Sequence, residues 1–305
     1  MIKIFAVVLN WNGADDTIGC VKFLKKMRLE DSQLNIVIVD NGSKPDEIEK
    51  LERLSGVTLI ENKRNLGYAG GNNIGIRYAL DKGADYVLII NNDTIAHENL
   101  VVRLVEAAEK DLDGGIFSPK MYFARGFEFH KNRYKKSEIG KVIWYAGGDM
   151  DWKNVYGSNH GVDEIDRGQF NKVKEIDFAT GACMFIRSEM FKKVEFFDER
   201  YYLYLEDVDL SLRAKKTGYK VWFVPKATLW HKVSQSSAIG SELNDYYTTR
   251  NRLLFGIKYA PMHTKFALIK ESVKLLLNGR KWQKIGVIDF YLCNFGKGSW
   301  PTRGG

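Results

Sequence analysis

The sequence comprises 305 residues, 45% of them hydrophobic and 28% charged, which suffices for one large ordered domain or for a domain with an appendage. We expect no membrane-spanning helix, because no window approaches about 18 uninterrupted apolar residues, and we expect no signal peptide. We also expect no disulfide framework and no cysteine metal site, because the three cysteines are scattered, which suits a reducing cytoplasm. The net charge of +8 is concentrated at one end: residues 246–305 hold eleven basic and two acidic side chains, whereas residues 1–245 hold 35 basic and 36 acidic ones.

Short apolar runs alternate with helix-like stretches over the first 120 residues, which predicts an α/β fold of βαβ units with a largely parallel sheet. The predicted strands are Ile4–Leu9, Ile36–Val39, Val57–Ile60, Tyr86–Ile90 and Gly115–Ser118, and the predicted helices lie near Asp15–Met27, Pro45–Leu54, Gly71–Leu80 and Glu98–Lys110. Pro45 suits a first helical turn, with Ser43 as a candidate N-cap.

The stretch 122–170 is rich in aromatic residues, glycine and charge and has little periodicity, so we expect a long insertion with irregular or hairpin structure. Further elements are predicted after it: strands at Val173–Phe178, Ala182–Ile186 and Lys220–Val224, and a helix at Tyr204–Thr217. We therefore predict one domain over residues 1–240, with halves at 1–120 and 121–240, followed by a tail at 241–305.

The tail is predicted to form two or three amphipathic helices between Leu243 and about Phe295, with lysine and arginine on their polar sides. Two interpretations stay open: an appendage packed on the main domain with a solvated basic face, or a contact with an anionic membrane surface. The uneven charge favours the membrane, which predicts a cytoplasmic protein peripheral at the inner face of the cell membrane. The slightly acidic main domain argues against nucleic acid as a partner.

Polar loops follow several predicted strands, at the edge where parallel strands place their carboxyl ends and where such folds bind ligands. Such residues are also common in ordinary turns. As ligands, the oxygens of Asn92 and Asp93 suit Mg²⁺ or Mn²⁺ holding a diphosphate, and Asp40 can accept an N–H from a pyrimidine base. The loops are Asn10-Trp11-Asn12-Gly13, Asp40-Asn41-Gly42-Ser43, Asn65-Leu66-Gly67-Tyr68-Ala69-Gly70-Gly71-Asn72 and Asn91-Asn92-Asp93-Thr94, and the glycines of the third let backbone N–H groups approach a diphosphate.

Two further positions have a structural and a chemical interpretation. The carboxylates of Glu206 and Asp207 can be stabilised by the dipole of the predicted helix, or one of them can deprotonate an acceptor hydroxyl. Asp209 is expected to be structural or a surface charge. His231 can be an ordinary core or surface histidine, or a neutral imidazole that completes a metal site begun by Asp93.

The ordered set of motifs resembles glycosyltransferase family 2, in the branch that includes rhamnosyltransferases and galactofuranosyltransferases. The resemblance covers roughly residues 3–235 and rests on the four loops above together with Thr180-Gly181-Ala182-Cys183-Met184, Glu206-Asp207-Val208-Asp209 and Trp230-His231. It implies a GT-A fold and an inverting, metal-dependent transferase that uses a UDP- or dTDP-sugar. The acceptor would be a hydroxyl of a glycan or lipid-linked saccharide, in the synthesis of cell-surface polysaccharide or glycoconjugate.

The resemblance also implies a role for each matching residue. Asp207 would be the catalytic base, and Asp93 and His231 the ligands of Mg²⁺ or Mn²⁺. Gly181, Ala182 and Glu206 would lie on the acceptor side. The nucleotide-sugar would be bound by Asn10, Asn12, Asp40, Asn41, Asn65, Gly67, Gly71, Asn72, Asn92 and Asp93.

The sequence departs from the family at Asn91, which stands where the first acid of the Asp-x-Asp motif is usual and removes one negative charge from the donor pocket. Two competing hypotheses are kept: a sugar-phosphate nucleotidyltransferase, and a non-enzymatic basic module that binds membrane or nucleic acid. The first would need a Lys- or Arg-bearing glycine loop after the first strand, which Asn10-Trp11-Asn12-Gly13 does not provide.

Overall fold

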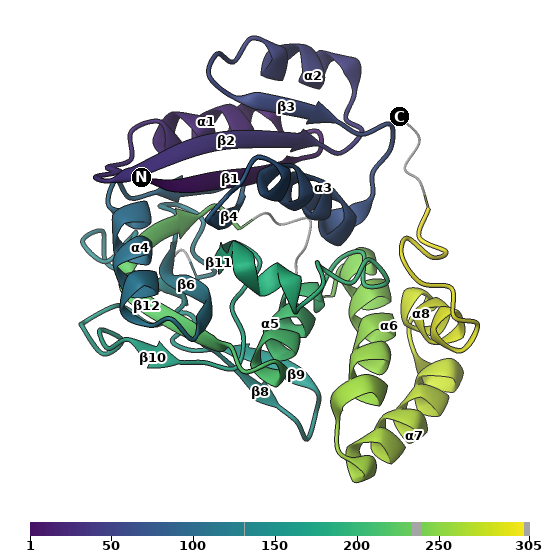
Figure 1. The fold of residues 1–305 in the computed structure, drawn as a ribbon. Helices are drawn as coiled ribbons and strands as arrows, with labels where there is room; N and C mark the ends of the chain where they lie inside the picture. The colour runs from purple at the N-terminus through teal and green to yellow at the C-terminus, as the bar shows by residue number, and fades with distance from the viewer. Residues whose placement is uncertain (131, 234–239, 302–305) are drawn as a thin grey trace.

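The computed structural model describes residues 1–130, 132–233 and 240–301, which form a central sheet flanked by helices (Figure 1). The strands are β1 (Ile2–Asn10), β2 (Ser32–Asp40), β3 (Thr58–Glu61), β4 (Tyr86–Asn91), β5 (Thr94–Ala96), β6 (Gly114–Phe123), β7 (Ile143–Tyr145), β8 (Gly148–Asp151), β9 (Tyr156–Asn159), β10 (Lys174–Glu175), β11 (Cys183–Arg187) and β12 (Lys220–His231). The helices are α1 (Ala14–Leu24), α2 (Pro45–Glu52), α3 (Gly67–Asp81), α4 (Leu100–Lys110), the 3₁₀ helix η1 (Ser188–Lys192), α5 (Glu206–Lys216), α6 (Glu242–Tyr259), α7 (Met262–Asn278) and α8 (Lys281–Tyr291).

The main sheet is mixed, with the strand order β10-β12-β6-β11-β4-β1-β2-β3. Strands β3, β2, β1 and β4 run parallel, as the alternation of strands and helices predicts. Strand β11 runs antiparallel to both β4 and β6 and so joins this parallel half to the parallel pair of β6 and β12. Strands β8 and β9 form a separate hairpin within the predicted insertion.

The register of the parallel strands brings their polar ends to one edge of the sheet. Asn10 faces Asp40 across β1 and β2, and Leu9 faces Asn91 across β1 and β4. The loops that carry Asp40 and Asp93 therefore leave the sheet side by side, as expected at the carboxyl ends of parallel strands.

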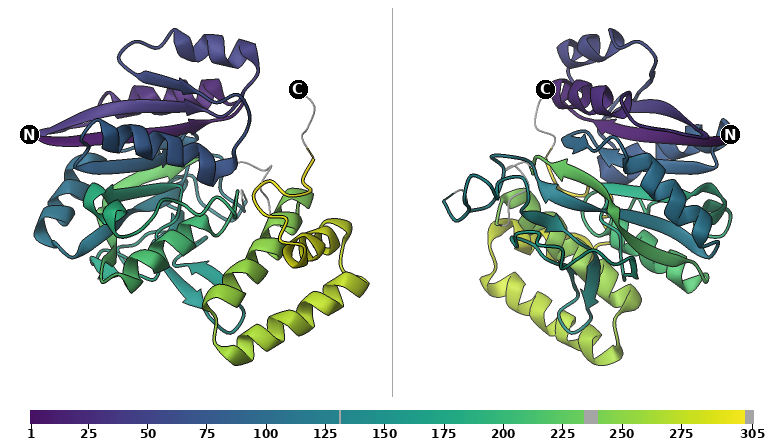
Figure 2. Two further views of the ribbon diagram at one scale, coloured as in Figure 1. Left: turned by 45° about the vertical axis from the view of Figure 1, so that its right-hand side comes forward. Right: turned by 90° about the vertical axis from the view of Figure 1, so that its left-hand side faces the viewer.

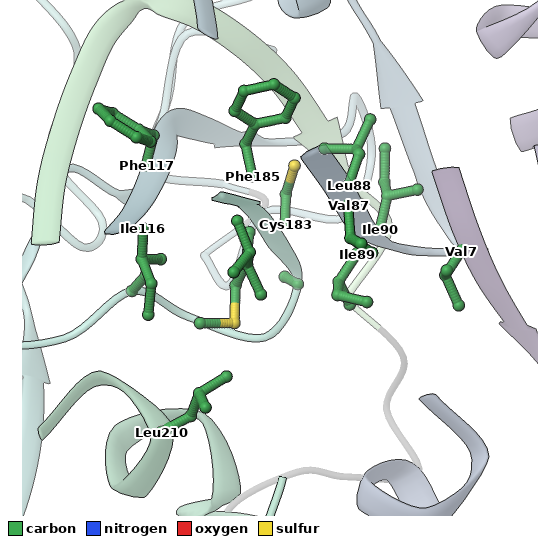
Figure 3. Close-up of a cluster of buried hydrophobic side chains, with 14 of the residues drawn as sticks. Val7, Val87, Leu88, Ile89, Ile90, Ile116, Phe117, Cys183, Phe185 and Leu210 are labelled. Atoms are coloured by element: carbon green, nitrogen blue, oxygen red, sulfur yellow. The ribbon is translucent and has the colours of Figure 1, made fainter. Parts of the chain in front are cut away.

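The core lies on both faces of the central strands, because β4 is buried along most of its length. Val87, Leu88 and Ile89 are fully buried and lie beside Phe185 of β11 (Figure 3). A continuous apolar run of this kind is typical of a strand covered on both faces. This rigid centre positions the polar loops at its edge.

The three C-terminal helices stand beside α5 at one side of the molecule, with α7 farthest from the sheet (Figures 1 and 2). Three helices agree with the predicted tail. Helix α6 is largely buried, whereas α7 buries only Thr264, Leu268 and Ser272. None of the described helices is long and apolar enough to cross a membrane.

Several predicted boundaries are wrong. The helix expected from Tyr204 begins at Glu206, because Tyr204 and Leu205 have φ values of +72°. The strand expected at Val173–Phe178 is reduced to Lys174–Glu175. Helix α3 begins at Gly67, so most of the glycine-rich motif lies within the helix.

The predicted N-cap of α2 is also wrong. Lys44 occupies that position, and no side chain caps the helix. The hydroxyl of Ser43 instead accepts hydrogen bonds from the backbone N–H of Asn12 at 2.8 Å and from Nδ2 of Asn10 at 3.2 Å. Ser43 therefore joins the loops that follow β1 and β2.

Candidate active site

Asp40 lies at the centre of a hydrogen-bonded pair of loops and is fully buried. Its Oδ2 accepts a hydrogen bond from Nδ2 of Asn10 at 2.8 Å, and its Oδ1 accepts the backbone N–H groups of Gly42 and Ser43 at 3.1 and 2.9 Å. A carboxylate has about four acceptor positions. Three are filled from within the protein, so recognition of a base by Asp40 stays a prediction.

The exposed tip of the loop after β1 carries Trp11 and Asn12. The side chain of Asn12 is held by the backbone N–H of Lys44, which donates to its Oδ1 at 2.9 Å. Trp11 is 50% exposed. The sequence analysis did not select Trp11, since a single aromatic residue in a turn carries no signal of its exposure.

Asn41 holds the loop between β3 and α3. Its Nδ2 donates to Oδ1 of Asn65 and to the carbonyl of Gly67, both at 3.0 Å, and its Oδ1 accepts from Asn62 and from the backbone of Leu66. All four hydrogen-bonding positions of the amide are used. Asn41 and Asn65 therefore hold the predicted donor loop in its conformation through hydrogen bonds within the protein.

The start of α3 is capped from within the protein. The carbonyl of Tyr202 accepts the N–H groups of Tyr68 at 2.7 Å and Ala69 at 3.3 Å, and Oδ1 of Asn65 accepts that of Gly67 at 2.8 Å. Direct contact between these N–H groups and a diphosphate would require displacement of those acceptors. The predicted contact of this loop with a donor diphosphate therefore remains untested.

Two glycines and an asparagine of α3 are packed against their surroundings. Gly67 has a φ of +76°, and a Cβ there would lie 2.5 Å from Tyr202. A Cβ on Gly71 would lie 2.4 Å from Leu9. Asn72 is buried, and its Nδ2 donates to the carbonyl of Tyr68 at 2.9 Å.

Asp93 and His231 meet at the predicted metal position. Asp93 lies in the turn between β4 and β5, and His231 ends β12, which pairs with β5 so that His231 faces Thr94. Nε2 of His231 lies 3.0 Å from Oδ1 of Asp93. The fold thus brings together two residues that are 138 positions apart in the sequence. The distance of 3.0 Å between the two atoms is also that of an ordinary hydrogen bond.

The donor set fits a partial site for a hard divalent cation. One carboxylate and one imidazole leave the remaining ligand positions to phosphate oxygens and water, as is usual for Mg²⁺ held with a nucleotide. No group of three His, Cys, Asp or Glu side chains that could hold a metal ion occurs among the described residues. Nδ1 of His231 is buried and has no hydrogen-bond partner within residues 1–130, 132–233 and 240–301.

Asn92 turns away from this pair and contacts the first loop. Its Nδ2 donates to Oγ1 of Thr17 at 3.0 Å and to the carbonyl of Gly13 at 3.3 Å. Thr17 in turn donates to Oδ1 of Asn10 at 2.7 Å. Thr17, which the sequence analysis did not select, therefore joins the loops of Asp40 and Asp93 into one polar network.

Asp207 lies in the first turn of α5 and is partly exposed. Its Oδ2 accepts the backbone N–H of Gly181 at 2.7 Å, and its Oδ1 accepts that of Val208 at 2.8 Å. Burial raises the pKa of the Asp207 carboxyl, and these two N–H groups offset part of the rise. A carboxylate with a raised pKa is a stronger base, and the two N–H donors favour its ionised form.

Gly181 and Ala182 connect Asp207 to the turn of Asp93. The carbonyl of Ala182 accepts the backbone N–H of Asn91 at 3.0 Å, and the hydroxyl of Tyr68 donates to the carbonyl of Gly181. The candidate base, Asp207, is thus hydrogen-bonded to the segment just before β11. The candidate metal ligand, Asp93, follows β4, the strand that pairs with β11.

Glu206 differs from its neighbour. It is 4% exposed, and among the described residues no group donates a hydrogen bond to its Oε2. Burial, and then the charge of Asp207, raise the pKa of Glu206 well above its usual range. Of the two carboxyl groups, Glu206 is therefore the one whose surroundings disfavour ionisation more, because no donor offsets the effect of its burial at Oε2 among the described residues.

Asp209 is structural, as expected. It is fully buried and accepts hydrogen bonds from Nε of Arg213, Nζ of Lys258 and the hydroxyl of Tyr259, all at 2.7 Å. These contacts fasten α5 to α6.

The sequence profile of one protein family, glycosyl transferase family 2, matches residues 6–195 of the chain, which is more than half of it. The chain belongs to glycosyltransferase family 2. This membership confirms the predicted family and the predicted enzyme class, a glycosyltransferase. It leaves the nucleotidyltransferase and the non-enzymatic module without support.

Curated members of this family have similar sequences. The chain is 26% identical over 226 residues to the N-acetylglucosaminyl-diphospho-decaprenol L-rhamnosyltransferase of Mycobacterium tuberculosis, covering 71% of this chain and 72% of that protein. It is 23% identical over 290 residues to the dTDP-rhamnosyl transferase RfbF of Shigella flexneri, covering 92% and 84%. It spans only 54% of the low-salt glycan biosynthesis hexosyltransferase Agl10 of Haloferax volcanii, at 24% identity over 61% of this chain.

Solved structures show the fold of this glycosyltransferase. The mannosyltransferase PcManGT of Pyrobaculum calidifontis, in complex with GDP-Man and Mn²⁺, superimposes with a TM-score of 0.55 at 14% identity, covering 97% of this chain and 87% of that one. GalNAc-T7 with UDP, GalNAc and Mn²⁺ has a TM-score of 0.58 at 17% identity, covering 83% and 51%. The predicted GT-A fold is thereby confirmed.

Proposed function

We propose that this glycosyltransferase moves a sugar from a UDP- or dTDP-sugar to a hydroxyl of a glycan or lipid-linked saccharide, with inversion at the anomeric carbon, in the synthesis of a cell-surface polysaccharide or glycoconjugate. The observation that carries the proposal is the arrangement of Asp207. Its carboxylate is partly exposed, is held by the N–H groups of Gly181 and Val208, and lies next in sequence to Glu206, whose pKa is raised by burial.

In this mechanism Asp207 accepts the proton of the acceptor hydroxyl as the oxygen attacks the anomeric carbon from the face opposite the diphosphate. One bond forms to the acceptor oxygen and one breaks to the diphosphate oxygen, so no covalent enzyme intermediate is needed. General base catalysis contributes about 10²–10⁴-fold. Burial, and then the charge of Asp207, raise the pKa of Glu206, which disfavours a second negative charge beside the base.

The pair of Asp93 and His231 would hold Mg²⁺ or Mn²⁺. A bound divalent cation would supply Lewis-acid stabilisation of the charge that develops on the leaving diphosphate. The Mn²⁺ in the complexes of GalNAc-T7 and PcManGT supports this part of the proposal. Because Asn91 stands where the first acid of the Asp-x-Asp motif is usual, the carboxylate of this pair comes from Asp93 and its other ligand from His231.

Rhamnose is the first donor sugar to test, because two of the similar proteins carry rhamnosyl names. The test is a panel of UDP- and dTDP-sugars, scored for thermal stabilisation of the protein and for donor hydrolysis with and without Mn²⁺. We expect one donor to stabilise the wild-type protein and Asp207→Asn equally.

Donor turnover should fall by about 10²–10⁴-fold in Asp207→Asn, since the base is lost while the nucleotide site is untouched. Asp93→Ala is the matched metal variant and should lose the Mn²⁺-dependent part of the stabilisation. Near-full turnover by Asp207→Asn contradicts the base, and Mn²⁺-independent binding in the wild type contradicts the metal pair.

We further propose that the enzyme contacts an anionic membrane surface through α7, from the cytoplasmic side. Five large apolar residues follow at helical intervals along its outer face: Met262, Phe266, Ile269, Val273 and Leu277 are 63%, 66%, 42%, 50% and 69% exposed. Lys270 and Lys274 are exposed on the same helix. An apolar stripe beside lysines is typical of an interfacial helix on anionic lipid.

A further inference from the structure

The loop that leads into α5 has an unusual backbone. Three of its residues, Tyr202, Tyr204 and Leu205, have φ values of +64°, +72° and +72°. Non-glycine residues rarely adopt this left-handed conformation, and it persists only where the surrounding structure enforces it. Some neighbouring element must therefore hold the loop 201–205.

This loop contacts both halves of the candidate active site. Its carbonyl at Tyr202 caps α3 through the N–H of Tyr68 at 2.7 Å, on the donor side. Its last residue, Leu205, is followed directly by Glu206 and Asp207 and accepts the N–H of Asp209 at 2.9 Å. A change in the loop would move the start of α5, and with it the carboxylate of Asp207.

Two adjacent residues of α6, Arg250 and Asn251, hold the loop by its carbonyl groups. Nη2 of Arg250 lies 3.2 and 3.0 Å from the carbonyl oxygens of Arg200 and Tyr201. Nδ2 of Asn251 lies 2.8–2.9 Å from those of Tyr201, Leu203 and Tyr204. Nε of Arg250 also donates to Oδ1 of Asn251 at 3.0 Å, so the two side chains act as one unit.

The surroundings of Arg250 are unusual for a buried cation. Arg250 and Asn251 are both fully buried, and no ion pair within 4.0 Å of the guanidinium occurs in the part of the chain that the structure describes. The guanidinium instead lies 5.3 and 5.0 Å from the ring centroids of Tyr246 and Tyr247. Burial of a cation without a directly paired carboxylate is costly. Here Nη2 is directed at the carbonyls of Arg200 and Tyr201, and Nη1 donates to the hydroxyl of Tyr246 at 3.3 Å, which in turn donates to Asp289.

We propose that Arg250 and Asn251 are positioning residues for the proposed catalytic base. They hold the loop 201–205 in its left-handed conformation and so fix Asp207 against the N–H of Gly181. The inference rests on the proposed role of Asp207. It gives α6, which lies outside the matched family profile, a part in catalysis. In this role α6 does not touch the substrate, and the positive charge of the C-terminal helices is not needed.

The test compares Asn251→Ala with Leu268→Ala, which removes a buried contact between α7 and α6 and leaves the loop untouched. Both variants should lose thermal stability. We expect kcat to fall by about 10²-fold in Asn251→Ala, because a displacement of about 1 Å can have that effect, while the donor KM changes by less than about threefold. Leu268→Ala should keep kcat near the wild-type value at the same margin below its Tm.

A second variant and a second measurement make the outcome decisive. Arg250→Lys keeps the charge but loses the planar fork, and it should also lower kcat; it decides the matter if Asn251→Ala does not fold. Hydrogen–deuterium exchange needs no substrate. It should quicken in peptides covering 201–210 in both loop variants, while peptides of β1 and β4 stay unchanged.

Each result has one meaning. An equal loss of kcat in Asn251→Ala and Leu268→Ala, or unchanged exchange at 201–210, overturns the positioning role. If the wild-type protein transfers no sugar from any donor, the proposed function fails instead, and the exchange experiment still decides whether α6 holds the loop.

Discussion

At the scale of single residues, the active site depends on giving two adjacent carboxyl groups different proton affinities. Asp207 accepts N–H groups from Gly181 and Val208, whereas Oε2 of Glu206 is buried without a donor among the described residues. By residue type alone Glu206 and Asp207 were similar candidates, and the family resemblance selected Asp207. Their surroundings favour ionisation of Asp207 over that of Glu206, because hydrogen bonds favour a carboxylate and burial disfavours it.

Replacement of Glu206 by glutamine should change how stability depends on pH. The pKa of Glu206 is raised on folding, so above pH about 4.3 the folded state keeps a proton that the unfolded state has lost, and stability falls as pH rises. Glu206→Gln removes this fall. Its free energy of unfolding, relative to wild type, should rise between pH 5 and pH 8 by at most about 1.4 kcal/mol per pH unit.

Chemical denaturation of both proteins at pH 5 and pH 8 measures this difference. An identical difference at the two pH values would show that Glu206 is ionised in the folded protein. The wild-type Asp207 would then lie beside a second negative charge, and the proposed division of roles between the two residues would be wrong.

At the scale of elements, α3 can pack closely on the sheet because glycines face it. A Cβ on Gly75 would lie 2.3 Å from Cγ1 of Val7 and 3.1 Å from Cγ2 of Val39. Val7 is fully buried and its side chain has little rotational freedom. Close packing here fixes the start of α3, and with it the donor loop between β3 and α3.

Two alanine substitutions at mid-helix glycines should therefore have opposite signs. Gly19→Ala in α1 meets no atom within 4 Å and should stabilise the protein by about 0.5–1 kcal/mol through helix propensity. Gly75→Ala gains the same propensity but overpacks the core, at a cost of about 1–3 kcal/mol. Urea denaturation of the two variants checks this, and stabilisation by Gly75→Ala would show that α3 can move off β1.

At the scale of the whole molecule, the C-terminal helices have two different surfaces. Helix α6 faces inward and holds the loop before Asp207. Helix α7 lies farthest from the sheet (Figure 2), with its apolar stripe exposed. The exposed side of α7 carries apolar side chains together with Lys270 and Lys274, so the membrane contact stays a proposal beside the alternative of a tail packed on the domain.

Binding to lipid vesicles tests the outer surface. Phe266→Asp should lower the affinity for vesicles that contain phosphatidylglycerol by at least about tenfold, because burial of one large apolar side chain contributes about 1.5–3 kcal/mol. Leu112→Asp is the matched control, as Leu112 is 75% exposed between α4 and β6, away from α7. Binding should weaken with salt.

Loss of binding in both variants, or equal affinity for neutral vesicles, contradicts the proposed surface. A wild-type dimer that Phe266→Asp converts to a monomer would assign the stripe to a second copy of the chain.

The sequence by itself determined the alternation of strands and helices over the first 120 residues, the family, and the loops that meet at one sheet edge, because apolar periodicity and strand-end motifs are local patterns. The pairing of Asp93 with His231 was one of two interpretations that the residues left open, and the family resemblance selected it. The tertiary structure decided what depends on packing and long-range hydrogen bonds. These features are the antiparallel β11, the left-handed backbone at Tyr204 and Leu205, and the hydrogen bonds from α6 to the carbonyl groups of that loop. A backbone angle enforced from 50 residues away leaves no signal in a local pattern.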